Sequence, residues 1–302
     1  MERIAFVKGH GTENDFVLIP DLDGALDLGA ATVAALCHRR AGIGGDGILR
    51  VVRTEAEPDA APYRGAAEWF MDYRNADGSL AQMCGNGIRV FARYLVDAGH
   101  QAPGQFLVAT RGGVRTVTCG PTGDVTVDMG PYALPDLGAV NVTVGSRTWP
   151  ALAVMMPNPH AVVFVEDLTE AGDLLTPPQV TPGAFPEGVN VEFVLVRGPR
   201  HVAMRVHERG VGETQACGTG ACAVMVASAR RAGAGAPTTY RVEQPGGSLL
   251  ITLTADGNVE MTGPAVLVAE GTWLLGAEFG SSDGVDPCHA EVVSTGATTG
   301  TV

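Results

Sequence analysis

Short apolar segments separated by Gly, Pro and Asp dominate the pattern of hydrophobic and polar positions along the chain. Runs of about four to eight such residues, bounded by turn residues, are typical of β-strands rather than helices. The pattern therefore predicts a β-rich protein with mostly mixed or antiparallel sheets. The clearest predicted strands are 16–19, 48–52, 125–129, 162–165, 191–196 and 249–253.

Two segments carry the helical spacing of three or four residues instead. The first has an apolar stripe that ends before Gly99, made of Ile88, Phe91, Ala92 and Leu95. The second has a stripe of apolar and small residues that ends before Gly233, made of Ala221, Val224, Met225 and Ser228. Glycine is a common helix stop. We predict two helices with one buried face each, and both begin directly after a cysteine.

The two predicted helices follow the same motif, Cys-Gly-x-Gly, at Cys84 and at Cys217. These motifs lie 133 residues apart, and landmarks downstream keep this offset to within one residue. The matching pairs are Gly112-Gly113 with Gly246-Gly247, Gly123-Asp124-Val125 with Gly257-Asn258-Val259, Gly130-Pro131 with Gly263-Pro264 and, at an offset of 144, Asn14 with Asn158 and Asp46 with Asn190. The repetition indicates two halves of one ancestral plan that present two thiols to one cleft.

Length and composition fit two domains. The chain has 302 residues, of which 45% are hydrophobic, enough to bury two cores of ordinary size. We place the N-terminal half at 1–132, completed by 272–280, and the C-terminal half at 133–271, with 133–137 as the crossing between them. The segment 281–302 is rich in Gly, Ser and Thr without periodicity, and we expect a loose tail to which we assign no function.

Charge and hydropathy argue against two classes of partner. The formal net charge is −13 with a sequence pI near 4.9, and no basic run of five or more residues occurs, so nucleic acid is not expected. The first residues read as a short strand, and no uninterrupted apolar run of about 18 residues appears. We expect a cytoplasmic protein without membrane contact. Six cysteines without a Cys-x-x-Cys pair fit reduced thiols better than disulfides.

A cysteine at a helix start can be chemically special. Unpaired backbone N–H groups and the positive end of the helix dipole lower the pKa of a nearby thiol and attract anions. A single free cysteine is usually a small buried hydrophobe, and this interpretation stands for Cys37, Cys119, Cys222 and Cys288. Two cysteines in matching motifs favour a function. Inversion at a carbon needs a base on one face and an acid on the other, a demand that a thiolate and a thiol satisfy.

No cofactor or metal is expected for this chemistry. Pyridoxal phosphate requires a Schiff-base lysine, and the chain contains one lysine, Lys8. The sequence has neither His-Glu-x-x-His nor paired Cys or His at ligand spacing; His207-Glu208 and the pair Cys217 and Cys222 come nearest. The α-carbon of an amino acid is a weak acid, so two converging helix N-termini would have to hold the carboxylate of its carbanion.

Eight ordered motifs together resemble the diaminopimelate epimerase family, from about residue 4 to about residue 275. They are Gly9-His10-Gly11 with Asn14-Asp15-Phe16, Gly42-Ile43-Gly44-Gly45-Asp46-Gly47, Asn75-Ala76-Asp77-Gly78-Ser79, Met83-Cys84-Gly85-Asn86-Gly87, Asn158-Pro159-His160, Gly188-Val189-Asn190, Glu208-Arg209-Gly210-Val211-Gly212-Glu213-Thr214 and Ala216-Cys217-Gly218-Thr219-Gly220. Either Cys-Gly-x-Gly motif alone would also suit proline racemase or other relatives. The ordered set is what makes the resemblance specific.

The resemblance implies cofactor-independent interconversion of LL- and meso-diaminopimelate, in the pathway to lysine and peptidoglycan, by a homodimer. It implies an α+β fold of two pseudo-symmetric halves, each a mixed β-sheet or barrel wrapped around a central helix. The catalytic residues that it implies are Cys84, Cys217, Glu208 and His160. The substrate-binding residues that it implies are Asn14, Asn75, Gly85, Asn86, Asn158, Asn190, Glu208, Arg209, Gly218 and Thr219.

Several of these residues also have a plain structural interpretation. Glu208 would accept a hydrogen bond from the substrate ammonium while Arg209 clamps the distant carboxylate, but an adjacent Glu-Arg pair is often only exposed surface. His160 either orients a catalytic group or fills a polar core site. Asparagines and glycines of the set are ordinary turn and helix-start residues when taken singly. The resemblance, rather than spacing, makes them binding candidates.

The chain departs from the family pattern at Thr12-Glu13, Gln82, Gly47 and Ala269. Gly47 stands where some members carry a contacting Gln, and Ala269 stands where some carry an interface Tyr. These two positions leave one substrate contact and the dimer contact open. Two other classes also stay open: an amino-acid sensor or carrier that kept the cleft, and a proton-shifting isomerase on the same architecture. The presence of both cysteines weighs against the isomerase.

Overall fold

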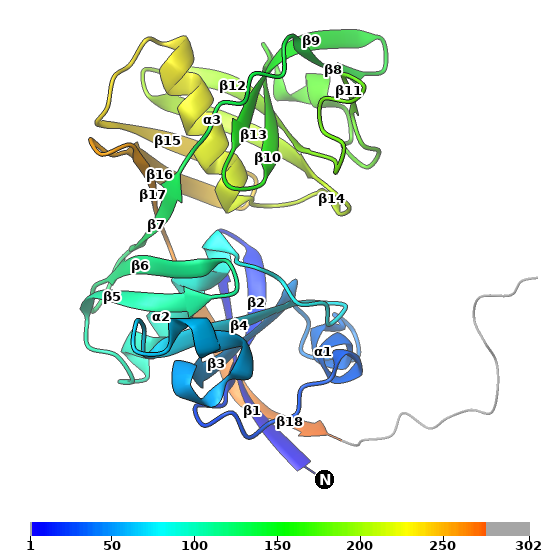
Figure 1. Ribbon diagram of the computed structural model, residues 1–302. Helices are drawn as coiled ribbons and strands as arrows, with labels where there is room; N and C mark the ends of the chain where they lie inside the picture. The colour runs from blue at the N-terminus through cyan, green and yellow to red at the C-terminus, as the bar shows by residue number, and fades with distance from the viewer. Residues whose placement is uncertain (1, 276–302) are drawn as a thin grey trace, which may run out of the picture.

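The computed structural model describes residues 2–275 (Figure 1). The tail expected at 281–302 and the end of the expected 272–280 segment lie outside the described residues. The N-terminal half contains β1 (Glu2–Gly11), β2 (Asn14–Pro20), α1 (Ala30–Cys37), β3 (Gly47–Arg53), η1 (Thr54–Ala56), η2 (Pro58–Tyr63), β4 (Trp69–Asn75), α2 (Gly85–Asp97), β5 (Gly104–Thr110), β6 (Gly113–Cys119) and β7 (Val125–Pro131). The chain continues with β8 (Val140–Val144), β9 (Arg147–Met155), β10 (Pro159–Phe164), η3 (Leu168–Ala171), β11 (Gln179–Val180), β12 (Asn190–Gly198), β13 (His201–Glu208), β14 (Gly212–Glu213), α3 (Gly218–Arg231), β15 (Thr238–Gln244), β16 (Gly247–Leu253), β17 (Asn258–Gly263) and β18 (Val266–Leu275).

The same order of strand pairings occurs in both halves. In the first, β1–β2 is antiparallel, β2–β3 parallel, β3–β4 antiparallel, β4–β5 parallel, and β5–β6 and β6–β7 antiparallel. In the second, the ladder β9, β10, β12, β13, β15, β16, β17 repeats these directions step by step. The predicted α+β fold of two pseudo-symmetric halves is confirmed.

Each sheet wraps around one helix at its centre. The helix α2 follows β4, and α3 follows β13, at the same place in the two ladders. Residues 85–95 of α2 are all buried, as are 220–229 of α3. Both helices are therefore enclosed on all sides in their first turns, which is typical of a central rather than a surface helix. The main hydrophobic core lies between these helices and the strands around them.

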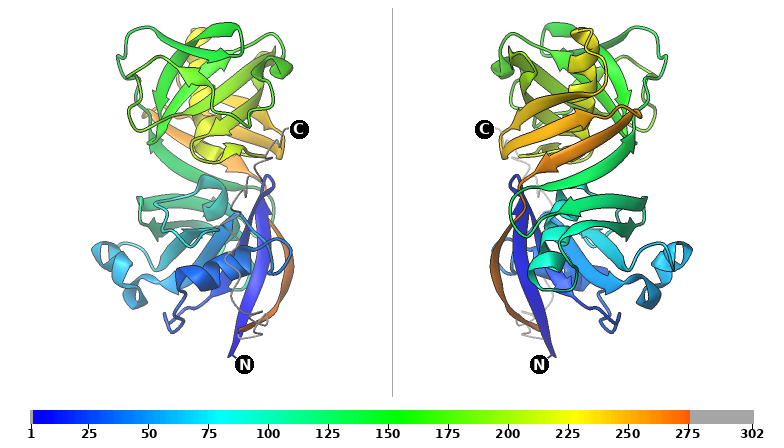
Figure 2. Two further views of the ribbon diagram at one scale, coloured as in Figure 1. Left: turned by 90° about the vertical axis from the view of Figure 1, so that its right-hand side faces the viewer. Right: turned by 90° about the vertical axis from the view of Figure 1, so that its left-hand side faces the viewer.

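The strands β7, β17 and β18 connect the halves (Figures 1 and 2). β7 pairs with β6 of the N-terminal half and also with β17 of the C-terminal half, where Val127 faces Met261. After β17 the chain returns as β18, which runs antiparallel to β1. Ala133 pairs with Met155 of β9, so the chain joins the second half directly after β7. The exact domain boundaries stay a prediction.

The predicted strands and helices are found where the pattern placed them, and the ends of the strands differ from the prediction by up to three residues. The six predicted strands correspond to β2, β3, β7, β10, β12 and β16, and the two predicted helices to α2 and α3. The pattern of apolar positions predicted neither α1 nor most of the remaining strands. None of the helices in the described part of the chain combines the length and apolarity that a membrane span requires.

Candidate active site

Each cysteine of the repeated motif caps the first turn of its helix. Cys84 precedes α2 and Cys217 precedes α3, and both have the extended backbone of an N-cap residue. The Sγ atom of Cys84 accepts a hydrogen bond from Gly87 N at 3.4 Å. The Sγ atom of Cys217 accepts one from Gly220 N at 3.4 Å. Both thiols thus lie at the positive ends of helix dipoles, where first-turn N–H groups can also bind an anion.

The strand topology brings other candidate residues to matching ends of the two sheets. In the N-terminal half, Asn14 is the first residue of β2 and Asn75 is the last of β4. In the C-terminal half, Asn190 begins β12 beside His160 of β10, and Glu208 ends β13. Parallel and antiparallel pairings alternate, so these strand ends lie side by side at the same end of each sheet. That end of the sheet faces the start of the central helix.

Cys84 is half-buried and has mostly uncharged neighbours. Its Sγ donates to Asn14 Oδ1 at 3.5 Å, and Asn14 Nδ2 donates to Asp46 Oδ2 at 2.7 Å. Burial raises the pKa of the Cys84 thiol to about 11, although hydrogen bonds from the N–H groups of Gly87 and Asn86 oppose the rise. The negative charge of Glu208 and the positive charge of Arg89 have smaller, opposite effects on this pKa, and the thiol stays protonated at neutral pH in the free protein.

Cys217 is almost fully buried and lies among polar and acidic groups. Its N–H donates to Gln244 Oε1 at 2.7 Å, and its Sγ lies 3.6 Å from Thr219 Oγ1. Burial, followed by the negative charges of Glu208 and Glu192, raises the pKa of this thiol well above its usual value. Cys217 therefore holds its proton tightly in the ligand-free site.

His160 belongs to a buried polar chain on the Cys217 side. Its Nδ1 lies 2.6 Å from Glu192 Oε1, and its Nε2 lies 3.1 Å from Asn158 Oδ1. Both His160 and Glu192 are fully buried. A Cβ atom on Gly220 would lie 2.9 Å from Glu192 Oε1 and 3.2 Å from Cys217 Sγ, so the carboxyl group and the thiol flank this glycine. His160 is therefore hydrogen-bonded to Glu192 in the buried interior, and its role in catalysis stays a prediction.

Glu208 and Arg209 are adjacent in sequence and differ in environment. Thr214 Oγ1 donates to Glu208 Oε1, and burial raises the pKa of this carboxyl group. The alternative of an exposed Glu-Arg surface pair is therefore wrong for Glu208. Arg209 is exposed; its N–H donates to Asn190 Oδ1 at 2.9 Å and its Nη1 to Glu187 O at 2.6 Å. A ligand carboxylate could replace that loop carbonyl as the partner of the guanidinium group.

The starts of the two helices meet at Asn86. Its Nδ2 donates to Asn14 Oδ1 at 3.3 Å and to the carbonyl of Ala216, the residue before Cys217, at 3.4 Å. A Cβ atom on Gly218 would lie 3.5 Å from Asn86 Oδ1. The negative charge of Glu208 raises the pKa of both thiols. Both cysteines therefore belong to one site between the halves.

Two expected contacts look different in the structure. Asn75 Nδ2 donates to Ser79 Oγ at 2.9 Å within its own turn, and among the described residues no hydrogen bond joins its side chain to either thiol. A Cβ atom on Gly47 would lie 2.4 Å from Arg74 O. A side chain at this position would force β3 and β4 apart, so the departure from the family pattern has a packing reason. Ala269 lies exposed on β18.

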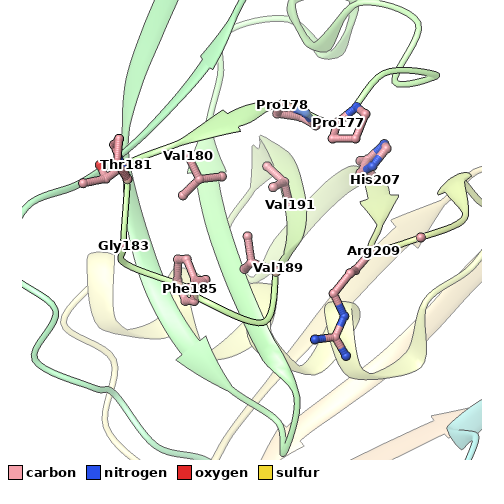
Figure 3. Close-up of a pocket in the computed structure, with 13 residues that line it drawn as sticks. Pro177, Pro178, Val180, Thr181, Gly183, Phe185, Val189, Val191, His207 and Arg209 are labelled. Atoms are coloured by element: carbon pink, nitrogen blue, oxygen red, sulfur yellow. The ribbon is translucent and has the colours of Figure 1, made fainter.

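A pocket of about 270 Å³ lies beside Arg209, between the 177–191 segment and β13 (Figure 3). Its lining is mainly apolar, with His207 and Arg209 at one side. Neither Cys84 nor Cys217 lines it, and Arg209 is the candidate site residue that lines it. Within residues 2–275, no group of three or more His, Cys, Asp or Glu side chains is arranged to hold a metal ion.

Sequence reasoning missed three residues of the site. Glu192 lies in the predicted strand 191–196, and a lone acidic residue between Val and Phe in a buried strand was the available signal. Gln244 and Thr214 bind Cys217 and Glu208 from loops and strand ends. Thr214 belongs to the motif that begins at Glu208 but was given no role there, and no residue pattern distinguishes Gln244 from ordinary polar positions, because only the tertiary fold brings it to the site.

Comparisons with known proteins agree with this geometry. The family model for diaminopimelate epimerase matches residues 6–135 and 152–268. The diaminopimelate epimerase of Streptomyces coelicolor is 64% identical over 284 residues, which cover 91% of this chain and 98% of the relative. That of Thermobifida fusca is 48% identical over 278 residues, which cover 90% and 98%.

Solved structures with the same fold have more distant sequences. A phenazine biosynthesis protein of the PhzF family from Bacillus anthracis aligns with a TM-score of 0.67 at 14% identity, covering 91% of this chain and all of the other. A hydroxyproline epimerase from Agrobacterium vitis aligns with a TM-score of 0.61 at 16% identity, covering 89% and 92%. At these identities the likeness concerns the fold alone. Taken with the family match and the close relatives, the chain belongs to the diaminopimelate epimerase family.

Proposed function

We propose that this protein interconverts LL- and meso-diaminopimelate by proton transfer between two thiols, without a cofactor. One observation carries the proposal: two cysteines cap two central helices whose first turns meet through Asn86. The names of the close relatives, all diaminopimelate epimerases, support the choice of substrate. The lysine and peptidoglycan pathway and a cytoplasmic location follow from the family and stay predictions for this chain.

The reaction follows from the two helix caps. The substrate carboxylate binds the first-turn N–H groups at Gly85-Asn86 and Gly218-Thr219, and its α-carbon lies between the sulfur atoms. One cysteine, as thiolate, takes the α-proton on one face, and its S–H bond forms as the C–H bond breaks. The electron pair moves into the carboxylate, where fixed N–H donors stabilise the charge. The other cysteine, as thiol, then donates its proton to the opposite face, which inverts the centre and leaves a thiolate.

Acidic and polar side chains around the two thiols have supporting roles in this reaction. Glu208 accepts a hydrogen bond from the α-ammonium group, and the raised pKa from burial falls when that cation binds. His160, held by Glu192, keeps the polar side of Cys217 in place. Asn14 and Asn158 lie at matching strand starts and complete the reacting end of the site.

Substrate choice depends on the end that does not react. Arg209, with its backbone fixed by Asn190, binds the distal carboxylate, and Asn75 binds the distal polar groups. A site built for a second ammonium and carboxylate leaves these groups unpaired when a simple amino acid binds, and such a site rejects that ligand strongly. Diaminopimelate is therefore favoured over proline or glutamate.

A homodimer is part of the proposal. The outer face of β18 carries exposed Val266, Val268 and Leu274 beside Ala269. Exposed apolar residues on one strand are typical of an interface. Sedimentation equilibrium of the purified chain should give twice the monomer mass of 31.2 kDa. A monomer at micromolar concentration would contradict this part alone, because both thiols come from one chain.

The proposed activity is tested by turnover in heavy water. LL-diaminopimelate, proline, hydroxyproline and glutamate are offered separately to the purified protein, and products and recovered substrates are analysed by mass spectrometry. We expect turnover of diaminopimelate, with deuterium in the product before it appears in recovered substrate, because each thiol carries its own proton. Turnover of proline alone would overturn the substrate assignment. Tight binding of diaminopimelate without label exchange would favour the carrier alternative.

A further inference from the structure

Arg89 is a fully buried cation in the second turn of α2. Its guanidinium group donates to Asn86 Oδ1 at 2.7 Å, to Thr12 Oγ1 at 3.2 Å and to Pro264 O at 2.8 Å. These acceptors belong to the start of its own helix, to the β1–β2 turn and to the crossing from β17 into β18. The side chain therefore joins three segments that meet between the halves.

The positive charge of Arg89 is buried without a carboxylate partner. All three acceptors are uncharged, and no acidic side chain among residues 2–275 forms an ion pair with this guanidinium. The chain leaves room for it, since a Cβ atom on Gly263 would lie 2.4 Å from Nη1 and one on Gly11 would lie 3.0 Å from Nη2. A buried unpaired cation is unfavourable for stability, so stability alone does not explain Arg89 at this position.

The contact with Arg89 sets the orientation of the Asn86 carboxamide. Because Oδ1 accepts from the guanidinium group, Nδ2 must face the other way, towards Asn14 Oδ1 and Ala216 O. One of these acceptors also receives the hydrogen bond from Cys84 Sγ, and the other is the carbonyl directly before Cys217. Arg89 thus fixes the amide that lies between the two cysteines.

Arg89 also contacts Thr12, which packs on the C-terminal half near Cys217. Thr12 has a positive φ of 52° in the β1–β2 turn, and a Cβ atom on Gly246 would lie 2.1 Å from Thr12 O. The turn of the N-terminal half therefore packs directly on the β15–β16 turn of the C-terminal half. That second turn follows Gln244, which accepts the hydrogen bond from Cys217 N.

We propose that Arg89 is a positioning residue of the epimerisation, which holds both helix starts in register through Asn86 and Thr12. The inference rests on the proposed function for its kinetic consequence only. The positive charge of Arg89 also acts on the Cys84 thiol, and this charge effect concerns the free protein and can be measured without any substrate.

The charged and titratable groups around this pair have opposing effects. Burial raises the pKa of the Cys84 thiol, Glu208 raises it further and Arg89 lowers it, while Tyr73 lies near the same sulfur. Burial lowers the pKa of Arg89 to about 10, so the guanidinium stays protonated at neutral pH. The groups whose charges act on Arg89 are Cys84, Asp124 and Cys222.

The test compares Arg89 with Arg93, one turn further along the same helix. Arg93 is also buried, but its partners Asp97, Gly120 O, Pro121 O and Gly123 O all belong to the N-terminal half. Arg89→Met, Arg89→Lys, Arg93→Met and Arg93→Lys are prepared as full chains. The readouts are kcat and KM in both directions, thermal unfolding, and the pH at which iodoacetamide begins to alkylate Cys84, followed by mass spectrometry.

We expect Arg89→Met to lower kcat roughly 100-fold, since misplacement of reacting groups by about 1 Å has an effect of this size, with a smaller change in KM. It should also move the onset of Cys84 alkylation to higher pH, because loss of a positive neighbour disfavours the thiolate. Arg89→Lys should restore the alkylation onset but not kcat, because one ammonium cannot bind three acceptors in this geometry. The Arg93 variants should lose only thermal stability.

Equal effects of matched Arg89 and Arg93 variants on kcat and on the alkylation onset would overturn the inference. If Arg89→Met does not fold, Arg89→Lys decides the positioning role through kcat at unchanged thermal stability. A wild-type protein without turnover of diaminopimelate would overturn the proposed function, while the alkylation comparison would still decide the charge effect. The two failures are therefore distinguishable.

Discussion

Cys84 and Cys217 have the same backbone setting and different chemical surroundings. Each caps a central helix and accepts a hydrogen bond from the glycine three residues later. Beside Gly87, the space that a Cβ would fill is bordered by apolar side chains of β3 and β2 at 3.2 and 3.4 Å. Beside Gly220, the corresponding space is bordered by a carboxyl oxygen of Glu192 at 2.9 Å. The repeat preserves the helix start while the strands behind it differ.

The difference continues one turn into each helix. Arg89 lies five residues after Cys84, and Cys222 lies five residues after Cys217; both are fully buried. Arg89 therefore places positive charge near the first thiol, Glu208 acts on both thiols, and Glu192 adds negative charge near the second. The halves share the backbone donors that bind a carboxylate, and they differ in which thiol gives up its proton more easily. In the free protein both thiols have raised pKa values, and we expect Cys84 to lose its proton more easily than Cys217.

The largest effect should come from removing either sulfur. Cys84→Ala and Cys217→Ala should each lower epimerisation at least 100-fold, within the range of about 10² to 10⁴ attributed to a positioned proton carrier. Because the carboxylate and distal contacts remain, calorimetry should still detect binding of diaminopimelate. Turnover that survives one substitution would show that a single thiol suffices and would remove the basis for the comparison.

The two glycines test the different surroundings directly. Gly220→Ala should force Glu192 and Cys217 apart and lower kcat by up to about 100-fold, since both neighbours are polar groups of the site. Gly87→Ala meets Leu49 at 3.2 Å, the Cβ atom of Cys84 at 3.3 Å and Phe16 at 3.4 Å, with no carboxyl group among them, and should have a smaller effect on kcat. Steady-state kinetics of both variants provide the measurement, with circular dichroism as the check on folding. A larger loss from Gly87→Ala would contradict the assignment of Glu192 to the site.

Much of this arrangement could be predicted from the sequence, because its signals are local. The helix starts at Cys84 and Cys217 followed from the repeated motif and the apolar stripe after it, and the six predicted strands were apolar runs between turn residues. The helix α1 has no such signal, since its N-cap Gly29 makes no side-chain hydrogen bond and its Ala-rich sequence has little contrast between faces. Tertiary packing decides that segment.

The site was predicted less completely than the fold. The cysteines, Asn14 and Glu208 lie where their motifs indicated. Glu192 and Arg89 escaped notice because each is one charged residue within an apolar run, and a sequence does not reveal whether such a residue faces solvent or the core. The offset of 133 residues that pairs Arg89 with Cys222 was visible, but its meaning depends on the structure.

The pH dependence of the second thiol provides a finer test. The charge of Glu192 raises the pKa of Cys217, so Glu192→Gln should lower that pKa while keeping the shape of the side chain beside His160. At a fixed pH near neutrality the thiolate fraction rises, and alkylation of Cys217 should become several-fold faster. Alkylation of Cys84 in the same sample serves as the internal control and should change little. An unchanged rate at Cys217 would show that Glu192 carries no negative charge in the free protein.

The smallest effect should appear at matching strand starts. Asp46 Oδ2 accepts from Asn14 Nδ2 at 2.7 Å, whereas Asn190, at the corresponding place in the other half, accepts from Arg209 N. Asp46→Ala removes a hydrogen bond that is partly exposed, worth about 1 kcal/mol, and should raise KM roughly fivefold by freeing Asn14. Asp256→Ala, an exposed substitution in the β16–β17 turn, provides the control and should leave KM unchanged. If KM stays constant in Asp46→Ala, the hydrogen bond from Asn86 is enough to hold Asn14. The surroundings of Cys84 then depend on the Arg89–Asn86 contact more than on the Asp46–Asn14 contact.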